Sequence, residues 1–327
     1  MLALSDFEYK HLIVITADQY KHLSLRNGNI LIKDEDEEVI NQFSCAKIFC
    51  LFVIGECTLT TKLIDELLSF KISIVSLGFN LKYRWMIWNS LAGNTILRHQ
   101  QYTMTSDTML ALSKHIITNK ISNQRTLLMK IRNKKDELSD QIQKINQLLK
   151  SVACVDNPDS LRWLEGNAAK IFFQSYFAEL NRYKRLPRTK CDVINVLMDS
   201  GYTYLFHFIE ANCHLYGFDT YKWVYHTLFY ERKSLICDLM EPRRCIIDQK
   251  IKNMANLWQI HEEDFVLVKW EYQLSYSKGK EYTKHFLEII MEHKRQIFLY
   301  IKEYYKIIMK KEYDTLPTFD INTPSWS

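Results

Sequence analysis

The chain has 327 residues, of which 47% are hydrophobic and 25% charged, and its formal net charge is +5. This length and apolar content predict one large domain or two smaller ones with a sizeable core. No apolar stretch approaches the roughly 18 residues of a membrane span, and the start lacks a signal-peptide pattern, so we expect a cytoplasmic protein without membrane association. The eight cysteines form no C-x-x-C pair, which favours reduced core residues over a zinc site or a disulfide framework.

The first 88 residues read as a small β-rich domain. Short runs rich in β-branched and aromatic residues alternate with turn signals, at residues 11–16, 20–25, 30–33, 48–54, 72–77 and 81–87. Asn27-Gly28 lies between two of these runs and predicts a tight type I′ hairpin, because both residues tolerate a positive φ. The stretch 60–70 begins with threonines that can cap a helix and continues with leucines at helical spacing, so we expect one short helix there.

The remainder of the chain is predicted to be helical. No glycine or proline occurs from Asn94 to Asn157, and apolar residues between Ile131 and Leu149 recur at the spacing of one helix face. Further helices are expected at 160–183, 191–216, 234–257 and 282–310. We therefore predict an α+β protein with a β-rich domain (1–88), a helical catalytic and DNA-binding domain (89–314) and a flexible tail (315–327) that contains two prolines.

Two segments are rich in lysine and arginine and contain no acid. The first holds Lys120, Arg125, Lys130, Arg132, Lys134 and Lys135, and the second holds Arg182, Lys184, Arg185, Arg188 and Lys190. Clustered cations beside aromatic residues suit a nucleic-acid backbone, since each neutralised phosphate releases condensed counterions. A solvated helix face is the alternative for either run taken alone.

Two glutamates, an aspartate and a histidine form the candidate chemical centre. Glu165 precedes Gly166, Ala168 and Ala169, small residues that would let a neighbouring helix or backbone approach closely. Asp238 and Glu241 are three residues apart on one side of a helix. With His226, such carboxylates would suit Mg²⁺ or Mn²⁺. The residues alone leave alternatives open: the histidine could be a core residue, and the acids could pair with Arg243 or Arg244.

Several motifs in register add to this pattern, and together they cover most of the chain. They are Arg98-x-x-Gln101-Tyr102, Lys120-x-x-Asn123-Gln124, Glu165-Gly166-x-Ala168-Ala169, Arg185-x-Pro187, Asp192-x-x-Asn195-x-Leu197, Gly201-Tyr202-x-x-Leu205, Gly217-x-Asp219, His226, and Ser234-Leu235-x-x-Asp238-Leu239-Met240-Glu241-Pro242-x-Arg244 followed by Asp248. In this order the chain resembles the integrase of CRISPR spacer acquisition.

The resemblance implies roles for particular residues. The family's catalytic and metal-binding positions fall on Glu165, His226 and Glu241, and its auxiliary acid falls on Asp238. Nucleic-acid contacts are expected at Arg182, Lys184, Arg185, Arg188, Asn195 and Arg244. The chain departs from the family where Trp223-Val224-Tyr225 replaces the common Gly-Phe-Leu before the histidine. It also has Phe172 where a tyrosine is frequent, which argues against an essential phenol there.

The resemblance further implies an activity and partners. The family's members are divalent-metal-dependent DNA endonucleases and integrases of prokaryotes, which insert short foreign DNA segments into a CRISPR array by attack of DNA 3′-hydroxyls on the repeat phosphodiesters. Expected partners are double-stranded DNA (the prespacer and the repeat), a second copy of the chain held through the amino-terminal domain, and a small second adaptation protein in a heterohexamer.

Removing one carboxylate should slightly raise stability in metal-free buffer, because the remaining negative charges repel each other less.

Two other functions remain open from the sequence. A stand-alone DNA-repair or junction nuclease would use the same metal with water as the nucleophile. A catalytically silent DNA-binding adaptor would use the carboxylates only to brace helices.

Overall fold

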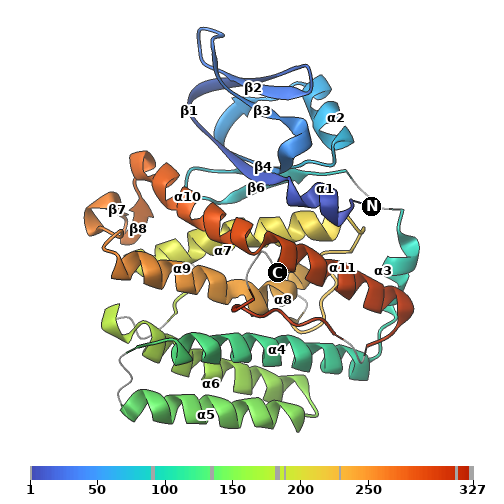
Figure 1. Ribbon diagram of the computed structural model, residues 1–327, viewed down its shortest axis with the longest axis vertical. Helices are drawn as coiled ribbons and strands as arrows, with labels where there is room; N and C mark the ends of the chain where they lie inside the picture. The colour runs from blue at the N-terminus through green and yellow to red at the C-terminus, as the bar shows by residue number, and fades with distance from the viewer. Residues whose placement is uncertain are drawn as a thin grey trace.

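The computed structural model describes residues 2–89, 93–132, 136–180, 185–187, 189–227, 230–313 and 316–323, and it has the α+β architecture expected from the sequence (Figure 1). A mixed sheet lies at one end of the molecule and helices fill the rest. The first part contains α1 (Leu4–Glu8), β1 (His11–Arg26), β2 (Asn29–Lys33), β3 (Val39–Ser44), β4 (Ile48–Thr58), α2 (Thr61–Ser69), β5 (Ser73–Leu77) and β6 (Tyr83–Ile87).

The helical part begins near Thr95. It contains α3 (Thr95–Tyr102), α4 (Ser106–Met129), α5 (Asp136–Ala153), α6 (Pro158–Tyr176), α7 (Val193–His214), α8 (Ser234–Met240), α9 (Arg244–Asn256), α10 (Tyr276–Glu292) and α11 (Lys294–Lys310), with a hairpin of β7 (Phe265–Val268) and β8 (Glu271–Leu274). In Figure 1, α4, α5 and α6 form the layer farthest from the sheet, and α7, α9 and α11 lie between them and the strands. No helix in the described ranges is long and apolar enough to span a membrane.

The sheet has the strand order β3-β2-β1-β4-β5-β6, in which β1, β4 and β5 are parallel neighbours and the other pairs are antiparallel. Asn27 and Gly28 both adopt a positive φ, of 50° and 69°, between β1 and β2, so the predicted hairpin is confirmed. Two predicted strands, at 11–16 and 20–25, are one continuous strand. Strand β3 and the β7–β8 hairpin were not predicted, because neither follows a clear apolar alternation.

Strand β4 explains how the sheet joins the helices. Its first eight residues are all buried, as expected for a strand covered on both faces. Leu51 packs with α2, whereas Phe52 faces the helices and its ring lies 5.4 Å from that of Tyr204 on α7. The sheet therefore shares one apolar core with the helical part.

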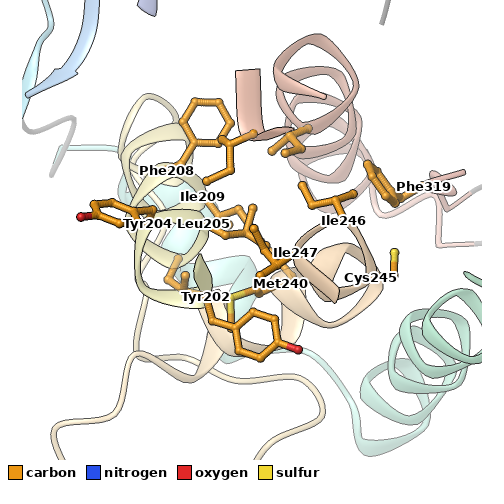
Figure 2. Packing of buried hydrophobic residues seen from close by; sticks show 14 of the residues in the cluster. Tyr202, Tyr204, Leu205, Phe208, Ile209, Met240, Cys245, Ile246, Ile247 and Phe319 are labelled. Carbon is orange, nitrogen blue, oxygen red and sulfur yellow. The ribbon is translucent and has the colours of Figure 1, made fainter. Parts of the chain in front are cut away.

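The centre of the helical core is the contact between α7 and the α8–α9 segment. Figure 2 shows Leu205 and Ile209 of α7 beside Ile246 and Ile247 of α9. Gly201 lies at the closest approach, because a Cβ there would stand 2.5 Å from Ile247 Cγ2. At Gly166, by contrast, a Cβ would meet nothing within 4 Å, so the expected close approach is wrong for the glycine, whereas Ala168 of the same motif is fully buried in the core.

Two predicted helices are interrupted. The predicted helix at 234–257 is divided at Pro242, which has no N–H to continue the hydrogen bonds of α8, so residues 241–243 form a 3₁₀ turn. The predicted helix at 282–310 begins earlier and is divided at His293, which ends α10 and precedes α11.

The predicted flexible tail is packed where the structure describes it. Phe319 is fully buried and Ile321 is 5% exposed. Asn119 and Asn123 of α4 donate side-chain hydrogen bonds to the Phe319 carbonyl at 2.7 and 2.9 Å, and their amide oxygens accept from the backbone N–H groups of Phe319 and Ile321. The expectation of a loose segment is therefore wrong for residues 316–323, which are held by α4.

Candidate active site

Lys120 of α4 joins two glutamates at the centre of the candidate site. Its ammonium group lies 2.6 Å from Glu241 Oε2 and also forms an ion pair with Glu165 of α6. The two carboxylates therefore face each other across one nitrogen atom. Glu241 is 5% exposed, whereas the Glu165 side chain is 22% exposed, so the site is open on the Glu165 side.

Local sequence fixes these positions. Helix α6 begins after Asn157, whose side chain accepts the Ser160 N–H at 2.8 Å, and Pro158 occupies the first helical position, where its missing N–H costs nothing. Glu165 follows two turns later. Glu241 stands at the break between α8 and α9, and Asn123 of α4 donates to the Pro242 carbonyl at 3.0 Å. That bond ties the turn to the helix that carries Lys120.

Asp238 orients His226. The Asp238 side chain is fully buried and accepts the backbone N–H groups of Val224, Tyr225 and His226 at 2.8 to 3.0 Å. Its Oδ1 also lies 2.5 Å from His226 Nδ1, so Nδ1 carries the hydrogen in the neutral ring. The Nε2 atom then faces Glu241, whose Oε1 is 3.9 Å away. Both carboxylate oxygens of Asp238 are thus used in hydrogen bonds to the segment 224–226 and to the His226 ring.

The charges of the site are balanced. Burial alone would raise the pKa of Glu241, but the neighbouring Arg244, Lys120 and His226 outweigh it and lower that pKa to about 2. Burial would lower the pKa of Lys120, but Glu241 and Glu165 reverse this effect and raise it. Glu241 therefore stays ionised and Lys120 stays charged at neutral pH.

The side chains of Glu165, Glu241 and His226 are chemically suited to a divalent cation, although they do not yet have the spacing of metal ligands. Within the described ranges, no three His, Cys, Asp or Glu side chains already stand at metal-binding spacing. Two carboxylates and an imidazole nitrogen nevertheless converge, and the Lys120 ammonium already stands as a cation between Glu165 and Glu241. Such a set of hard oxygen donors with one imidazole suits Mg²⁺ or Mn²⁺.

A second polar network lies beside this centre. The Tyr202 hydroxyl donates to Asp248 at 2.5 Å, and the Arg244 guanidinium stands over the Tyr202 ring at 5.0 Å while it pairs with Glu241 at 3.1 Å. Burial raises the pKa of Asp248 to about 6, even though Tyr202, Arg185 and Arg244 act in the opposite direction. Arg244, expected to contact nucleic acid, is therefore engaged within the protein.

The other expected DNA contacts fall into two groups. Asn195 is 2% exposed, and its amide bonds to Arg185, Leu186 and Asp192, so within the free protein it is engaged with its neighbours and its contact with DNA stays a prediction. Arg185 also pairs with Asp199, because both stand near the start of α7. Arg182, Lys184 and Arg188 lie outside the described residues.

Sequence reasoning placed Lys120 in a basic run and in the motif Lys120-x-x-Asn123-Gln124, but it missed the contact of this lysine with the two glutamates. A signal was present: Ile116, Lys120, Asn123 and Leu127 recur at steps of four, three and four, so the lysine lies on an apolar helix face. Among them, Ile116, Asn123 and Leu127 are at most 3% exposed. A lysine on such a face needs an acidic partner.

The fold is that of an α+β protein in which a mixed sheet is joined to helices. Its candidate site brings together two glutamates, a histidine and a lysine. The family model for CRISPR associated protein Cas1 matches residues 13–288. The CRISPR-associated endonuclease Cas1 1 of Thermodesulfovibrio yellowstonii is 30% identical over 224 residues, which are 65% of this chain and 70% of that protein. The chain belongs to the Cas1 family.

Solved structures share the fold. A casposase bound to integration product superposes with a TM-score of 0.79 at 18% identity, over 96% of this chain and 95% of that one. A Cas6-RT-Cas1–Cas2 complex gives a TM-score of 0.81 at 21% identity over 96% of this chain. The chain spans 36% of the matched polypeptide in that complex.

Proposed function

We propose that this protein is a divalent-metal-dependent DNA integrase and endonuclease of CRISPR adaptation. It would join the 3′-hydroxyl ends of short DNA segments to the phosphodiesters of a CRISPR repeat. The observation that carries the proposal is the convergence of Glu165 and Glu241 on a single positive group, with His226 Nε2 3.9 Å from Glu241. Family membership supports it, since curated relatives are named CRISPR-associated endonucleases.

Glu165, Glu241 and His226 would hold Mg²⁺ or Mn²⁺. When bound, the cation supplies polarisation of the scissile phosphate and compensation for the charge that develops on its oxygens. The protein's own groups do the rest: Asp238 fixes the orientation of His226, and Arg244 keeps Glu241 ionised. His226 Nε2 serves as a ligand or moves a proton at the reacting oxygen.

The partners proposed for this chain follow from its relatives. One structural neighbour is a complex with Cas2, and another holds an integration product. We therefore propose double-stranded DNA as substrate, a homodimer as the active unit, and a small second adaptation protein as the partner in a heterohexamer. Prokaryotic cytoplasm is the compartment where these partners would meet.

The test is strand transfer of an end-labelled duplex into a plasmid that carries a repeat. Glu165→Gln and Glu241→Gln should abolish joining, as should a chelator, because each removes the cation from the phosphate. The matched control is Glu179→Gln, a glutamate paired with Lys252 at 2.6 Å outside the site, which should join normally. Joining that persists in either site variant would refute the proposal. End cleavage without joining would favour the stand-alone nuclease, and DNA binding without either reaction would favour the silent adaptor.

A further inference from the structure

Lys120 is placed differently from Lys130, the other lysine of the first basic run that the structure describes. Its side chain is 11% exposed, and its nitrogen stands between the same two carboxylates that would bind a divalent cation. Lys130, ten residues further along the chain, is exposed. The ammonium group of Lys120 therefore lies where the divalent cation would bind.

Helix α4 holds Lys120 there. Asn119 and Asn123, which flank Lys120 in the sequence, bind the backbone of the segment 316–323, and Asn123 also binds the Pro242 carbonyl. The backbone of Lys120 is thus fixed, whereas its four-carbon stem has rotatable bonds that let the ammonium move by several ångströms. Only the charged end is free to leave the carboxylates.

We propose that Lys120 is an internal counter-ion that occupies the divalent-cation position and must swing out of it before the cation binds. This inference rests on the proposed function, because it presumes that Glu165 and Glu241 are the ligands. An ammonium and a divalent cation cannot share one pair of carboxylates, since the two positive charges would stand within a few ångströms of each other. Lys120 therefore lowers the affinity for metal and keeps the metal-free centre neutralised.

The displaced ammonium would take a phosphate oxygen of bound DNA as its new partner. A phosphate that holds Lys120 outside the centre raises the affinity for metal, and metal that expels Lys120 raises the affinity for phosphate, because such coupling is reciprocal. Arg244 does not take part in the exchange, since it binds the opposite oxygen of Glu241 at 3.1 Å. Lys120 thus makes saturation of the site with the divalent cation depend on bound DNA.

The first test measures the affinity for Mn²⁺ by isothermal titration calorimetry, with the whole chain and without DNA. Lys120→Met keeps the length of the stem and removes the charge, so Mn²⁺ should bind at least about tenfold more tightly than to the wild type. Lys252→Met is the matched control, because Lys252 is also buried and paired at 2.6 Å with a glutamate, and it should leave Mn²⁺ affinity unchanged. Equal or weaker Mn²⁺ binding by Lys120→Met would overturn the inference.

The second test uses the wild type and does not depend on the folding of a variant. The amine of Lys120 should acetylate faster when Mg²⁺ saturates the protein than in chelator, whereas Lys252 should react at the same rate in both. An unchanged rate at Lys120 under saturating Mg²⁺ also contradicts the inference. If wild type, Glu165→Gln and Glu241→Gln all bind Mn²⁺ alike, the proposed metal site itself fails, which is a distinguishable outcome.

Discussion

Glu241 is the residue whose ionisation most directly links the site to stability. Its pKa of about 2 is depressed from 4.5, so its stabilising contribution is present above about pH 4.5 and lost as pH falls through about 2. The sequence led us to expect that removing a carboxylate would relieve repulsion. The ion pairs with Lys120 and Arg244 reverse that expectation, because removal takes one of two carboxylates from Lys120 and the paired carboxylate from Arg244, and both cations are mostly shielded from water.

We therefore predict that Glu241→Gln destabilises the metal-free protein at pH 7, by an amount on the order of 3 kcal/mol. As pH falls from about 4.5 toward 2 the difference from the wild type should shrink, because the unfolded chain takes up a proton at Glu241 that the folded protein binds only near pH 2. Urea unfolding across pH 2.5 to 7 measures both effects. A variant as stable as the wild type at pH 7 would show that the ion pairs contribute nothing.

Asp238 provides a test of positioning as distinct from ligation. The Asp238 Oδ2 atom accepts the backbone N–H groups of Val224 and Tyr225. In Asp238→Asn an amide N–H₂ at this position would face those two donors, so their hydrogen bonds would be lost. We predict that Mn²⁺ binds roughly 10- to 100-fold more weakly, because His226 loses its fixed orientation. The decisive readout is ¹⁵N NMR of the His226 ring: Nδ1–H should dominate in the wild type and lose that dominance in the variant. An unaltered tautomer would contradict the assigned role.

At the scale of elements, close approach of α7 to α9 and α10 is set by one glycine. A Cβ at Gly201 would meet Ile247 Cγ2 at 2.5 Å and Phe286 Cδ1 at 2.9 Å, whereas the site of a Cβ at Gly166 is open. Gly201→Ala should thus cost about 1–3 kcal/mol of unfolding free energy. Gly166→Ala should gain up to about 1 kcal/mol, since alanine is the better helix former. Chemical denaturation of both variants measures this contrast, and two changes of the same sign would be inconsistent with it.

At the scale of the whole molecule, binding to DNA should depend on salt through the second basic run. We predict that Arg182→Ala with Lys184→Ala weakens binding to every sequence alike and flattens the slope of log affinity against log salt by about 2. Fluorescence anisotropy at several salt concentrations gives this slope. Arg185→Ala should instead lower the unfolding temperature, because Arg185 pairs with Asp199 and Asn195. An unchanged slope in the double variant would exclude the run from the DNA interface.

Assembly is the other property of the whole molecule. Strand β3 is an edge strand of the large sheet, and its Val39 and Ile40 are 50% and 52% exposed. An apolar edge strand invites pairing with a second chain, so we predict that Ile40→Lys shifts the proposed homodimer toward monomer. Light scattering measures the mass, with Glu263→Lys, far along the chain on an exposed turn, as the control. Truncation near residue 90 is a poorer test, since it uncovers the core shared by Phe52 and Tyr204.

Local patterns were sufficient for much of the fold. The Asn27-Gly28 hairpin, helix α2 and the change from strands to helices near residue 93 depend on backbone preferences and periodicity, which a short window of sequence contains. The break at Pro242 was also readable, because proline cannot continue a helix, but the helical pattern on both sides concealed it. Strand β3 could not be predicted, since its residues are mostly exposed and acquire order by pairing with β2.

The sequence was enough to show which residues could do chemistry, because Glu165, His226, Asp238 and Glu241 lie within several motifs in register that together identified the family. Only the tertiary structure decided what each of them contacts. Lys120 meets Glu165 and Glu241, and the segment at Phe319 meets Asn119, across 45, 121 and 200 positions of chain. Such contacts form because burial requires each charge and each backbone polar group to find a partner, and no periodicity in the sequence records which partner that is.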